Sequence, residues 1–359
     1  MAHVARAYFL DAPAAPLAPR ELTLADPGPG EAIVEVLACG LCHTDLGFAS
    51  GAVPTRHPLP LVLGHEVVGT VVAAGDDVAA LGGRRVIVPA VLPCGTCEFC
   101  RAGRGNACPN QKMPGNDVHG GFATHMLVPA APLVPLDDGP SGPPQGEHHD
   151  DRDLSVVADA VSTAYQAVRR ADLREGDAAF VVGGGGVGAF VVQIAHAMGA
   201  KVALCDVSAE RLSLLSAHGA DRTFVVDADV AGLRKRFSAL AREWGVPSLR
   251  IRIFECSGTP AGQTLAFALL ARGATLVQVG YTPEPVSVRL SNLMAFDATI
   301  HGTWGCPPEV YPEVLQLIAD GRVALGPFTE HAPMSALNDL LGAMARHELR
   351  ARMVLDPRT

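Results

Sequence analysis

Two sets of residues in this chain have the types and spacing of metal ligands. The first is a run of four cysteines within fifteen residues, in the pattern C-x2-C-x2-C-x7-C. Steps this short let one lobe of chain wrap four thiolates around a zinc ion with no position left for water, as in a structural site. The candidate ligands are Cys94, Cys97, Cys100 and Cys108.

Two other interpretations of the four-cysteine lobe stay open. Bacterial iron–sulfur proteins use the related pattern C-x2-C-x2-C-x3-C-P, and Pro109 follows Cys108 here. The last gap is seven residues instead of three, which favours zinc. Disulfides are the other alternative, although cysteines clustered at metal spacing suit a reducing compartment better.

The second set lies upstream and is more dispersed. It consists of Cys42 and the adjacent pair His65 and Glu66. A set with fewer protein ligands leaves a coordination position for water or substrate, which is typical of a catalytic zinc. We therefore expect one metal that stabilises the fold and one that does chemistry.

A glycine-rich turn indicates a dinucleotide site. An apolar strand at 178–182 is followed by Gly183, Gly185 and Gly188 in the pattern G-x-G-x-x-G, and then by a helix that Gly199 ends. The first glycine permits the tight turn, the second lets the backbone approach the pyrophosphate, and the third allows close helix packing. The helix N-terminus then favours the phosphate charge.

Asp206 ends the next predicted strand, at 201–206, about twenty residues after the glycines. A carboxylate at this place hydrogen-bonds the adenosine ribose 2′-hydroxyl and repels a 2′-phosphate, so the sequence predicts NAD in preference to NADP. Arg211 is assigned to the same cofactor site. The alternative is that Asp206 only caps a helix at 208–218.

The surrounding elements define an α/β fold class. The later part of the chain alternates apolar strands with helical stretches, which predicts a doubly wound parallel sheet of the Rossmann type. The first part has short β-type runs with frequent Gly and Pro, as in a β-rich, barrel-like domain. The predicted strands are 32–37, 67–73, 85–91, 178–182, 201–206, 222–226, 251–256 and 274–280.

Length and charge limit the possible partners. The chain has 359 residues, enough for two domains, with a Pro- and Gly-rich surface connection predicted at 137–153. A net charge of −9 argues against a nucleic-acid surface or a basic membrane patch, so the expected partner is a small molecule. The N-terminal residues lack the charged start and apolar run of a signal peptide, which predicts a cytoplasmic protein.

The local sequences around these sites resemble a known family. The segments CGLCHTD at 39–45 and GHE at 64–66, followed by the cysteine lobe and the glycine turn, are similar to zinc-dependent alcohol dehydrogenases of the medium-chain dehydrogenase/reductase family. The resemblance covers nearly the whole chain in order. It implies a homodimer or homotetramer, with a GroES-like catalytic domain and a Rossmann domain in each subunit. The implied boundaries are 1–159 and 303–359 for the catalytic domain, about 93–110 for its zinc lobe, and 160–302 for the Rossmann domain.

The same resemblance implies a set of catalytic zinc ligands. Cys42 and His65 match two of them. Most relatives supply a cysteine as the third ligand, where this chain has Asp159, but some members carry an acidic residue there, and a carboxylate is a sound zinc ligand. Glu66 is implied as an alternate ligand or as a support for one. The alternative is that Asp159 only caps the following helix and this metal is missing.

Further positions take roles from the family. Thr44 matches the hydroxyl that passes the alcohol proton onward, and Asp45 is expected to orient the ring of the histidine ligand. Gly47 stands where relatives often place a relay histidine, which leaves the last proton step open. His43 and Arg352 match basic groups that contact the cofactor pyrophosphate.

The implied reaction is oxidation of a secondary alcohol, with zinc stabilising the developing alkoxide and NAD accepting the hydride. Segments at 42–48, 113–122, 289–296 and 302–306 resemble family members that act on a cyclic allylic alcohol carried on coenzyme A, so an acyl-CoA is a candidate substrate beside free alcohols. The polyanionic carrier would need a basic patch. The candidate residues for that patch are Arg56, Arg101, Arg104 and Lys112.

Two rival classes of function stay open for the chain. A metal-independent enone or quinone reductase would share the two-domain layout but would not need Cys42, His65 and Asp159 together. A non-catalytic protein built around the zinc lobe would not need an intact glycine turn followed by Asp206.

Overall fold

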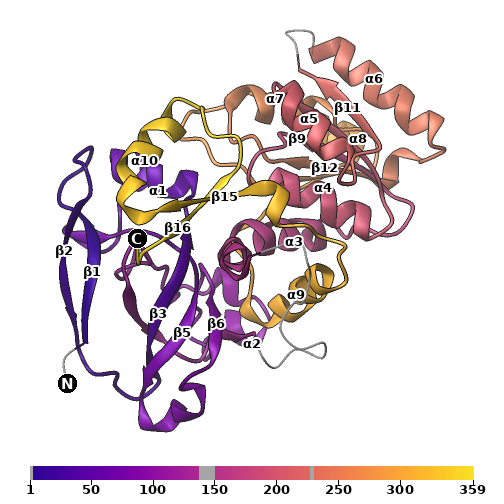
Figure 1. Cartoon of the computed structure of the whole chain (residues 1–359). Coiled ribbons are helices and arrows are strands. Elements are labelled where there is room, and N and C mark those ends of the chain that lie inside the picture. Colours follow the sequence, from indigo (N-terminus) through magenta and orange to yellow (C-terminus); the bar gives the residue numbers. More distant parts are fainter. Residues whose placement is uncertain (1–2, 137–149, 227–229) are drawn as a thin grey trace. The chain divides into compact units, whose positions relative to one another are not determined.

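The computed structural model describes residues 3–136, 150–226 and 230–359 (Figure 1). Contacts divide the chain into two units. Unit 1 comprises Met1–Ser162, Gly305–Ala319 and Leu325–Thr359, and unit 2 comprises Thr163–Trp304 and Asp320–Ala324. Most of the predicted surface connection, including His148 and His149, lies outside the described residues. Within the described ranges, no helix combines the length and apolar character needed to cross a membrane.

Unit 1 is rich in short strands. These are β1 (His3–Leu10), β2 (Ala18–Leu24), β3 (Glu31–Gly40), β4 (Leu61–Val62), β5 (Glu66–Ala74), β6 (Arg85–Val88), β7 (His125–Pro129), β8 (Val134–Pro135), β15 (Thr329–Pro333) and β16 (Arg352–Asp356). Its helices are α1 (His43–Ser50), α2 (Glu98–Arg101), α9 (Tyr311–Ala319) and α10 (Leu337–Ala345), and α3 (Ala160–Arg170) starts in this unit. The 3-10 helices are η1 (Asp76–Leu81), η2 (Gly105–Ala107), η3 (Asp151–Ala158), η5 (Pro308–Val310), η6 (Gly326–Phe328) and η7 (Met334–Ala336).

The strands of unit 1 form two sheets. One has the order β2-β1-β4, and the other has the order β15-β16-β3-β5-β6-β8, with β7 also paired to β3. All neighbours are antiparallel except β15 and β16. Figure 1 shows the C-terminal strand β16 beside β3, so the end of the chain completes the sheet that its first part begins. The predicted β-rich domain is confirmed.

Unit 2 is a parallel sheet covered by helices. Its strands are β9 (Ala178–Val182), β10 (Lys201–Asp206), β11 (Arg222–Val225), β12 (Ile251–Glu255), β13 (Thr275–Gln278) and β14 (Thr299–Gly302). Its helices are the greater part of α3, then α4 (Gly188–Ala197), α5 (Ala209–Ser216), α6 (Val230–Glu243), α7 (Pro260–Ala268), α8 (Ser291–Phe296) and the 3-10 helix η4 (Ser248–Arg250).

The strand order of unit 2 is β11-β10-β9-β12-β13-β14, and every pairing is parallel. Counted from β9 as the first strand, this is the order 3-2-1-4-5-6 of the Rossmann fold. The central strand β9 is buried along its whole length, because helices cover both faces of a parallel sheet, and its sequence AAFVV is accordingly apolar throughout. The predicted Rossmann sheet is confirmed.

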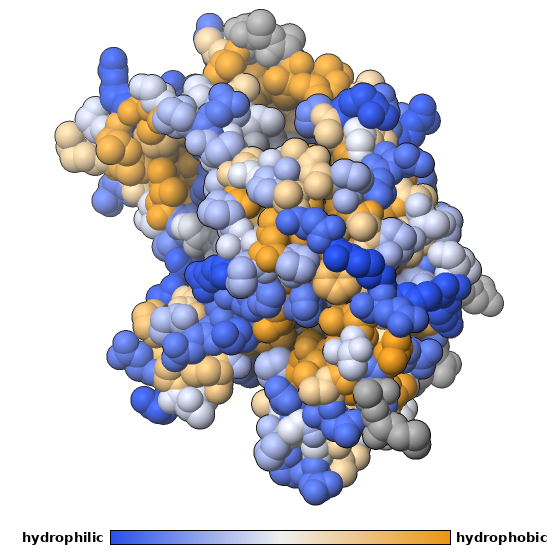
Figure 2. All heavy atoms as spheres, turned by 90° about the vertical axis from the view of Figure 1, so that its left-hand side faces the viewer, coloured by the Kyte–Doolittle hydropathy of each residue, from blue (hydrophilic) through white to orange (hydrophobic). Residues whose placement is uncertain are grey.

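Each unit has its own hydrophobic core. In unit 1 the largest cluster includes Phe48, Leu61 and Phe122, and in unit 2 it includes Phe180 and Phe237, which pack edge to face. Figure 2 shows hydrophilic and hydrophobic residues interspersed over one face of the molecule. The apolar clusters that stabilise the fold are the buried ones in each unit.

Candidate metal and cofactor sites

The four-cysteine lobe has the geometry of a tetrahedral thiolate site. Four of the distances between its sulfur atoms lie between 3.5 and 4.0 Å. A zinc ion with Zn–S bonds of about 2.3 Å would place its thiolates about 3.8 Å apart, whereas a disulfide would need about 2.05 Å. Gly95 and Gly103 adopt positive φ and let the chain turn tightly around the site. The residues fit one structural zinc.

The second set also converges. Cys42 comes just before α1, His65 and Glu66 lie at the start of β5, and Asp159 lies between η3 and α3. One ligand atom from each of these four side chains lies within 4.8 Å of the others. Asp159 Oδ2 is 3.9 Å from Cys42 Sγ and 3.6 Å from His65 Nε2. Residues that are 117 positions apart thus face one another inside unit 1.

Two buried atoms in this set have no hydrogen-bond partner among the described residues. They are His65 Nε2 and Glu66 Oε2. Buried polar atoms are normally satisfied, so an unpartnered nitrogen that faces a thiol and a carboxyl group calls for a further partner. Imidazole, thiolate and carboxylate are all zinc ligands. The residues therefore fit a zinc ion with nitrogen, sulfur and oxygen ligands.

Asp45 holds two members of this set in place. Its Oδ1 lies 3.2 Å from His65 Nδ1 and accepts a hydrogen bond from the Gly64 N–H, and its Oδ2 accepts one from the Cys42 N–H at 2.9 Å. The carboxylate is completely buried. A histidine held through one ring nitrogen presents the other to a metal, and this is the arrangement around His65.

The same contacts affect the protonation of His65. Burial lowers its pKa, but the negative charge of Asp45 and the nearby side chains of Asp159 and Cys42 outweigh burial and raise the pKa well above the usual 6.5. A histidine must be neutral at the coordinating nitrogen to bind a metal. A metal ion and a proton would therefore compete for Nε2.

Glu66 is paired with Arg352 in the structure. Arg352 Nη1 lies 3.3 Å from Glu66 Oε1, and the guanidinium also donates to the carbonyl of Leu41. The Arg352 side chain is only 6% exposed. The role of Arg352 at the cofactor pyrophosphate stays a prediction, while in the structure its guanidinium contacts Glu66 and the Leu41 carbonyl. Burial raises the pKa of Glu66 to about 7 even though Arg352 acts to lower it.

The remaining residues from the first segment lie on α1. Thr44 is half-buried, and its Oγ1 is 3.7 Å from Cys42 Sγ. His43 is exposed and stacks on His347, with ring centroids 6.4 Å apart. The chain turns after Gly47, and the N–H of Val53 donates a hydrogen bond to the carbonyl of Gly47. Thr44 is thus the described hydroxyl in this segment that lies next to a candidate ligand.

The glycine turn of unit 2 has the three features that the motif predicts. Gly183 has φ of +92°, and Gly188 packs so closely that a Cβ there would lie 1.9 Å from the Gly183 carbonyl oxygen. A Cβ on Gly185 would meet no atom within 4 Å. The middle glycine therefore borders open space at the N-terminus of α4, where a pyrophosphate would be stabilised by backbone N–H groups.

Asp206 lies beside this turn. Its carboxylate accepts hydrogen bonds from the N–H groups of Gly184 at 2.7 Å and Ser208 at 2.8 Å, and Arg211 Nη1 lies 3.6 Å from it. The N-cap of α5 is Ser208, whose hydroxyl accepts from the Arg211 N–H, so Asp206 is not the capping residue of that helix. The role of Asp206 as the partner of a ribose hydroxyl stays a prediction.

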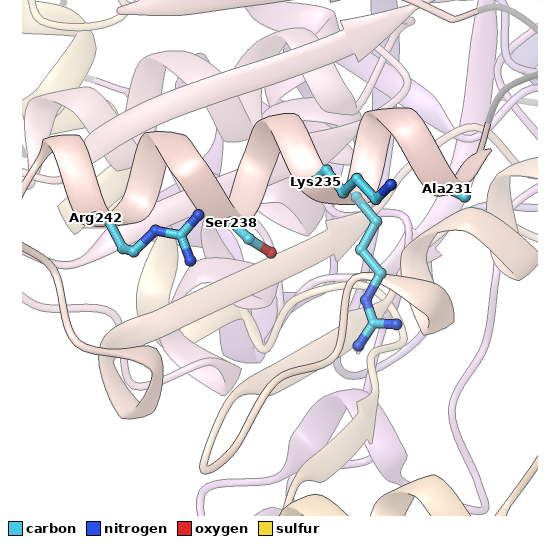
Figure 3. Close-up of a pocket in the computed structure, with 5 residues that line it drawn as sticks. Ala231, Lys235, Ser238 and Arg242 are labelled. Atoms are coloured by element: carbon cyan, nitrogen blue, oxygen red, sulfur yellow. The ribbon is translucent and has the colours of Figure 1, made fainter.

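A further hollow of about 350 Å³ lies on the exposed side of α6 (Figure 3). Its lining carries three cations and a hydroxyl but none of the candidate zinc ligands or motif glycines. The lining therefore shares no residue with the two candidate metal sites or with the glycine turn. The lining residues are Ala231, Arg234, Lys235, Ser238 and Arg242.

Some contacts around the second metal set could not be found from sequence patterns. The pairing of Glu66 with Arg352 joins the start of β5 to the last strand of the chain. Tyr311 and Ser162, which hydrogen-bond the backbone on either side of Asp159, are also absent from the predicted site. Glu66 and Arg352 were predicted separately and Tyr311 and Ser162 not at all, and only the folded chain brings these contacts together.

Comparisons with known proteins agree with the fold and with a zinc-binding dehydrogenase. Residues 28–138 match the alcohol dehydrogenase GroES-like domain, and residues 186–320 match the zinc-binding dehydrogenase domain. An alcohol dehydrogenase of Geobacillus stearothermophilus is 30% identical over 331 residues, which cover 91% of this chain and 92% of that protein. The acryloyl-coenzyme A reductase of Metallosphaera sedula is 30% identical over 308 residues, which cover 85% and 86%.

Solved structures extend the comparison. Acetophenone reductase from Geotrichum candidum NBRC 4597, in complex with NAD, has a TM-score of 0.82 and 26% identity, with 98% of this chain and 97% of that one covered. A metal-type ligand set and a Rossmann dinucleotide turn in one chain define a metal-dependent dehydrogenase. The chain belongs to the zinc-binding alcohol dehydrogenase family. It is an NAD(P)-dependent oxidoreductase of the alcohol dehydrogenase class.

Proposed function

We propose that the protein is an NAD-linked dehydrogenase that oxidises a secondary alcohol to a ketone, with one catalytic and one structural zinc ion per chain. The observation that carries the proposal is the buried set of Cys42, His65 and Asp159, in which His65 Nε2 has no hydrogen-bond partner among the described residues. In a chain of this family, a nitrogen, a sulfur and an oxygen ligand leave one tetrahedral position for an alcohol.

The residues around this set support the chemistry in separate ways. A bound zinc ion would supply a Lewis acid that stabilises the alcohol oxygen as its proton leaves. Asp45 contacts the ring of His65. We propose that the Thr44 hydroxyl, which lies next to Cys42, takes up the alcohol proton as it passes its own proton on. Because Gly47 carries no side chain, we propose that the proton passes from Thr44 to solvent.

The preference for NAD over NADP rests on Asp206. Its buried carboxylate lies at the end of β10, where it can accept a hydrogen bond from the ribose 2′-hydroxyl, and a 2′-phosphate placed there would be repelled. Acetophenone reductase, which has a similar fold, is known in complex with NAD. His43, Arg211 and Arg352 are proposed as further cofactor contacts on the resemblance alone.

For the substrate we propose a cyclic allylic secondary alcohol carried as a coenzyme A thioester, specifically 6-hydroxycyclohex-1-ene-1-carbonyl-CoA. The segments at 42–48, 113–122, 289–296 and 302–306 resemble the dehydrogenase of this compound, an enzyme of anaerobic aromatic degradation. One relative of the chain is an acryloyl-coenzyme A reductase, which also has an acyl-CoA in its name. Free secondary alcohols and ketones are the alternative substrates.

A CoA carrier needs a basic patch, and two of the four candidate residues for it already contact other groups of the protein. Arg56 forms an ion pair with Asp117 at 3.5 Å, and Arg101 donates to the carbonyl of Thr96. These pairings leave Arg104 and Lys112 as the less engaged candidates in that part of unit 1. The Arg56 side chain is 65% exposed, so its guanidinium is accessible to a phosphate, although Asp117 is only 9% exposed.

The test is a comparison of turnover for the CoA thioester and for the free cyclic alcohol, each with NAD and with NADP. We expect the thioester with NAD to give the highest kcat/KM. Equal kcat/KM for the free alcohol would remove the CoA part of the proposal. Undiminished activity after removal of the catalytic metal would instead favour a metal-independent reductase.

We also propose that the domains have the boundaries implied by the family, at 1–159 with 303–359 and at 160–302, and that the protein is a cytoplasmic homodimer or homotetramer. The family resemblance supports these statements. Light scattering of the purified protein tests the subunit count, and a mass equal to that of one chain would contradict it.

A further inference from the structure

We infer that Tyr311 is a positioning residue for the catalytic metal, acting through the backbone that carries Asp159. The inference rests on the proposed function, because it assumes that Asp159 is a zinc ligand. Tyr311 is the first residue of α9, is 1% exposed, and comes from the segment Gly305–Ala319 that rejoins unit 1 late in the chain. It supplies no ligand atom itself.

The Tyr311 hydroxyl holds the peptide before Asp159. It donates a hydrogen bond of 2.6 Å to the Ala158 carbonyl, which also accepts one from the Ala90 N–H. Ala158 is the last residue of η3, and carbonyls at a helix end have no partner within the helix. Tyr311 therefore fixes the direction in which the chain leaves η3, one residue before the carboxylate.

Two more contacts hold the peptide after Asp159. Ser162 Oγ lies 3.2 Å from the Asp159 carbonyl and 3.2 Å from the Tyr311 hydroxyl, so its single proton can bond either oxygen. The Ala160 N–H donates to Glu66 Oε1 at 3.2 Å. The backbone is thus anchored on both sides of Asp159 by side chains that are themselves buried.

This anchoring matters because Asp159 lies at a bend. Its φ of −136° and ψ of −65° belong to neither η3 nor α3, so the adjoining helices do not fix its conformation. A short side chain reaches the position shared with Cys42 and His65 only if its Cα is correctly placed. Tyr311 acts over 153 residues of sequence to provide that placement.

The Tyr311 hydroxyl keeps its proton, and so its ability to donate this hydrogen bond, near neutral pH. Burial raises the pKa of Tyr311 well above the usual 10, and Cys306 raises it further, so the group stays a neutral donor near neutral pH. Loss of a group that orients a metal ligand typically weakens metal binding or activity by about 10-fold to 100-fold. Removal of the Tyr311 hydroxyl should have an effect of this size.

The experiment compares Tyr311→Phe with the wild-type protein and with Val314→Ala as a matched control. Val314 lies on the same helix and is fully buried, but no polar contact joins it to the segment around Asp159. Zinc affinity is measured by competition with a chelator, and the ligand field is followed after cobalt substitution. Cofactor affinity and kcat are measured on the same samples.

For Tyr311→Phe we expect the structural zinc to be retained, the second zinc to bind about 10-fold or more weakly, and the cobalt spectrum to change. We expect kcat to fall and the NAD dissociation constant to stay the same. Val314→Ala should leave the metal affinity and the spectrum unchanged. Equal metal affinity in Tyr311→Phe and wild type, or an equal loss in both variants, would overturn the inference.

A second variant keeps the inference testable if Tyr311→Phe does not fold. Ser162→Ala keeps the bond from Tyr311 to Ala158 and removes only the hydroxyl that links Tyr311 with the Asp159 carbonyl. Ser162→Ala should lower the affinity for the second zinc by a smaller factor than Tyr311→Phe. An unchanged zinc affinity would then count against the inference. If the wild-type protein itself binds only one zinc, the proposed function fails before the role of Tyr311 is tested.

Discussion

Among single residues, Asp159 is the unusual member of the proposed zinc set. Most relatives are expected to carry cysteine there, and the change from thiolate to carboxylate keeps one negative charge. With Cys42 as the other anion and His65 neutral, the ligand charges would still balance Zn²⁺. A carboxylate is a harder ligand than a thiolate, so the site should accept metals that prefer oxygen more readily than a site with two cysteines.

Asp206 carries the prediction for cofactor choice. Asp206→Asn keeps the shape of the side chain but removes the charge that opposes a 2′-phosphate, and it leaves Arg211 free to pair with that phosphate. The affinity for NADP relative to NAD should rise about 10-fold or more, equivalent to about 1.4 kcal/mol. Dissociation constants for both cofactors check this.

Arg211 provides the control for that experiment. In the double variant Asp206→Asn with Arg211→Ala, the gain in NADP affinity should be smaller, because the cation 3.6 Å from residue 206 is gone. An unchanged NAD preference in the single variant would show that Asp206 serves only to hold the backbone N–H groups of Gly184 and Ser208.

The candidate residues were predictable from sequence where local spacing carries the chemistry. The four cysteines, the three motif glycines and Asp206 have spacings that are required by one ion or one cofactor. The pairing of Arg352 with Glu66 was not predictable, because it depends on β16 returning beside β3 after most of the chain has been folded. A basic residue near the C-terminus gives no sign of which acid it will meet.

Among the elements, the strand, turn and helix from β9 to α4 show how neighbouring glycines differ. Gly188→Ala would place a Cβ 1.9 Å from the Gly183 carbonyl, so we expect unfolding to become easier by about 2 kcal/mol or more. In Gly185→Ala the added Cβ would face open space. The free energy of unfolding of this variant should therefore stay within about 0.5 kcal/mol of wild type. Denaturant unfolding measures both.

Substitutions at Gly185 and Gly188 should also differ in their effect on cofactor binding. Gly185→Ala should weaken NAD binding without loss of stability, since the added methyl group would occupy space that the pyrophosphate needs. Calorimetric titration with NAD gives the affinity. Unchanged affinity in a well-folded Gly185→Ala protein would place the pyrophosphate away from this glycine.

The 3-10 helix η3, which leads to Asp159, is capped by an acid whose charge is stabilised. Asp150 accepts hydrogen bonds from the backbone and side chain of Arg152, and the side-chain bond lowers the pKa of Asp150 to about 2. The pKa of an unfolded aspartate is about 3.9. The native state therefore binds this proton less tightly, so the resulting stabilisation is full above about pH 5 and is lost as the pH falls toward 2.

Asp150→Asn should reduce this acid sensitivity. Asparagine is an equally good N-cap but cannot form the ion pair with Arg152. The free energy of unfolding should therefore be lower than wild type at about pH 6, and the difference should shrink as the pH falls from about 4 toward 2. Asp172→Asn, which removes an exposed ion pair with Arg174, is the control. A constant difference between variant and wild type at all pH values would contradict the assignment.

The elements themselves were predictable in proportion to their apolar patterning. The strands predicted at 178–182 and 201–206 agree with β9 and β10, because buried parallel strands are continuous apolar runs. β14 was not predicted, because its sequence, Thr-Ile-His-Gly, has a single large apolar residue and is mostly exposed at the sheet edge. Only pairing with β13 defines it as a strand.

In the molecule as a whole, the two proposed metals in unit 1 and the proposed cofactor in unit 2 have different tasks. The four-cysteine lobe is closed by its own thiolates and would keep its zinc when the other set is altered. Cys42 contributes to the second set alone. A single substitution at Cys42 can therefore remove the proposed catalytic zinc and leave the structural one and the cofactor site in place.

The most direct test is the zinc content of wild type and Cys42→Ser, measured together with NAD-linked alcohol oxidation. The account predicts about two zinc ions per chain and activity in wild type, and about one zinc ion, intact NAD binding and no detectable activity in Cys42→Ser. An active wild-type protein with one zinc ion per chain, or full activity in Cys42→Ser, would contradict it.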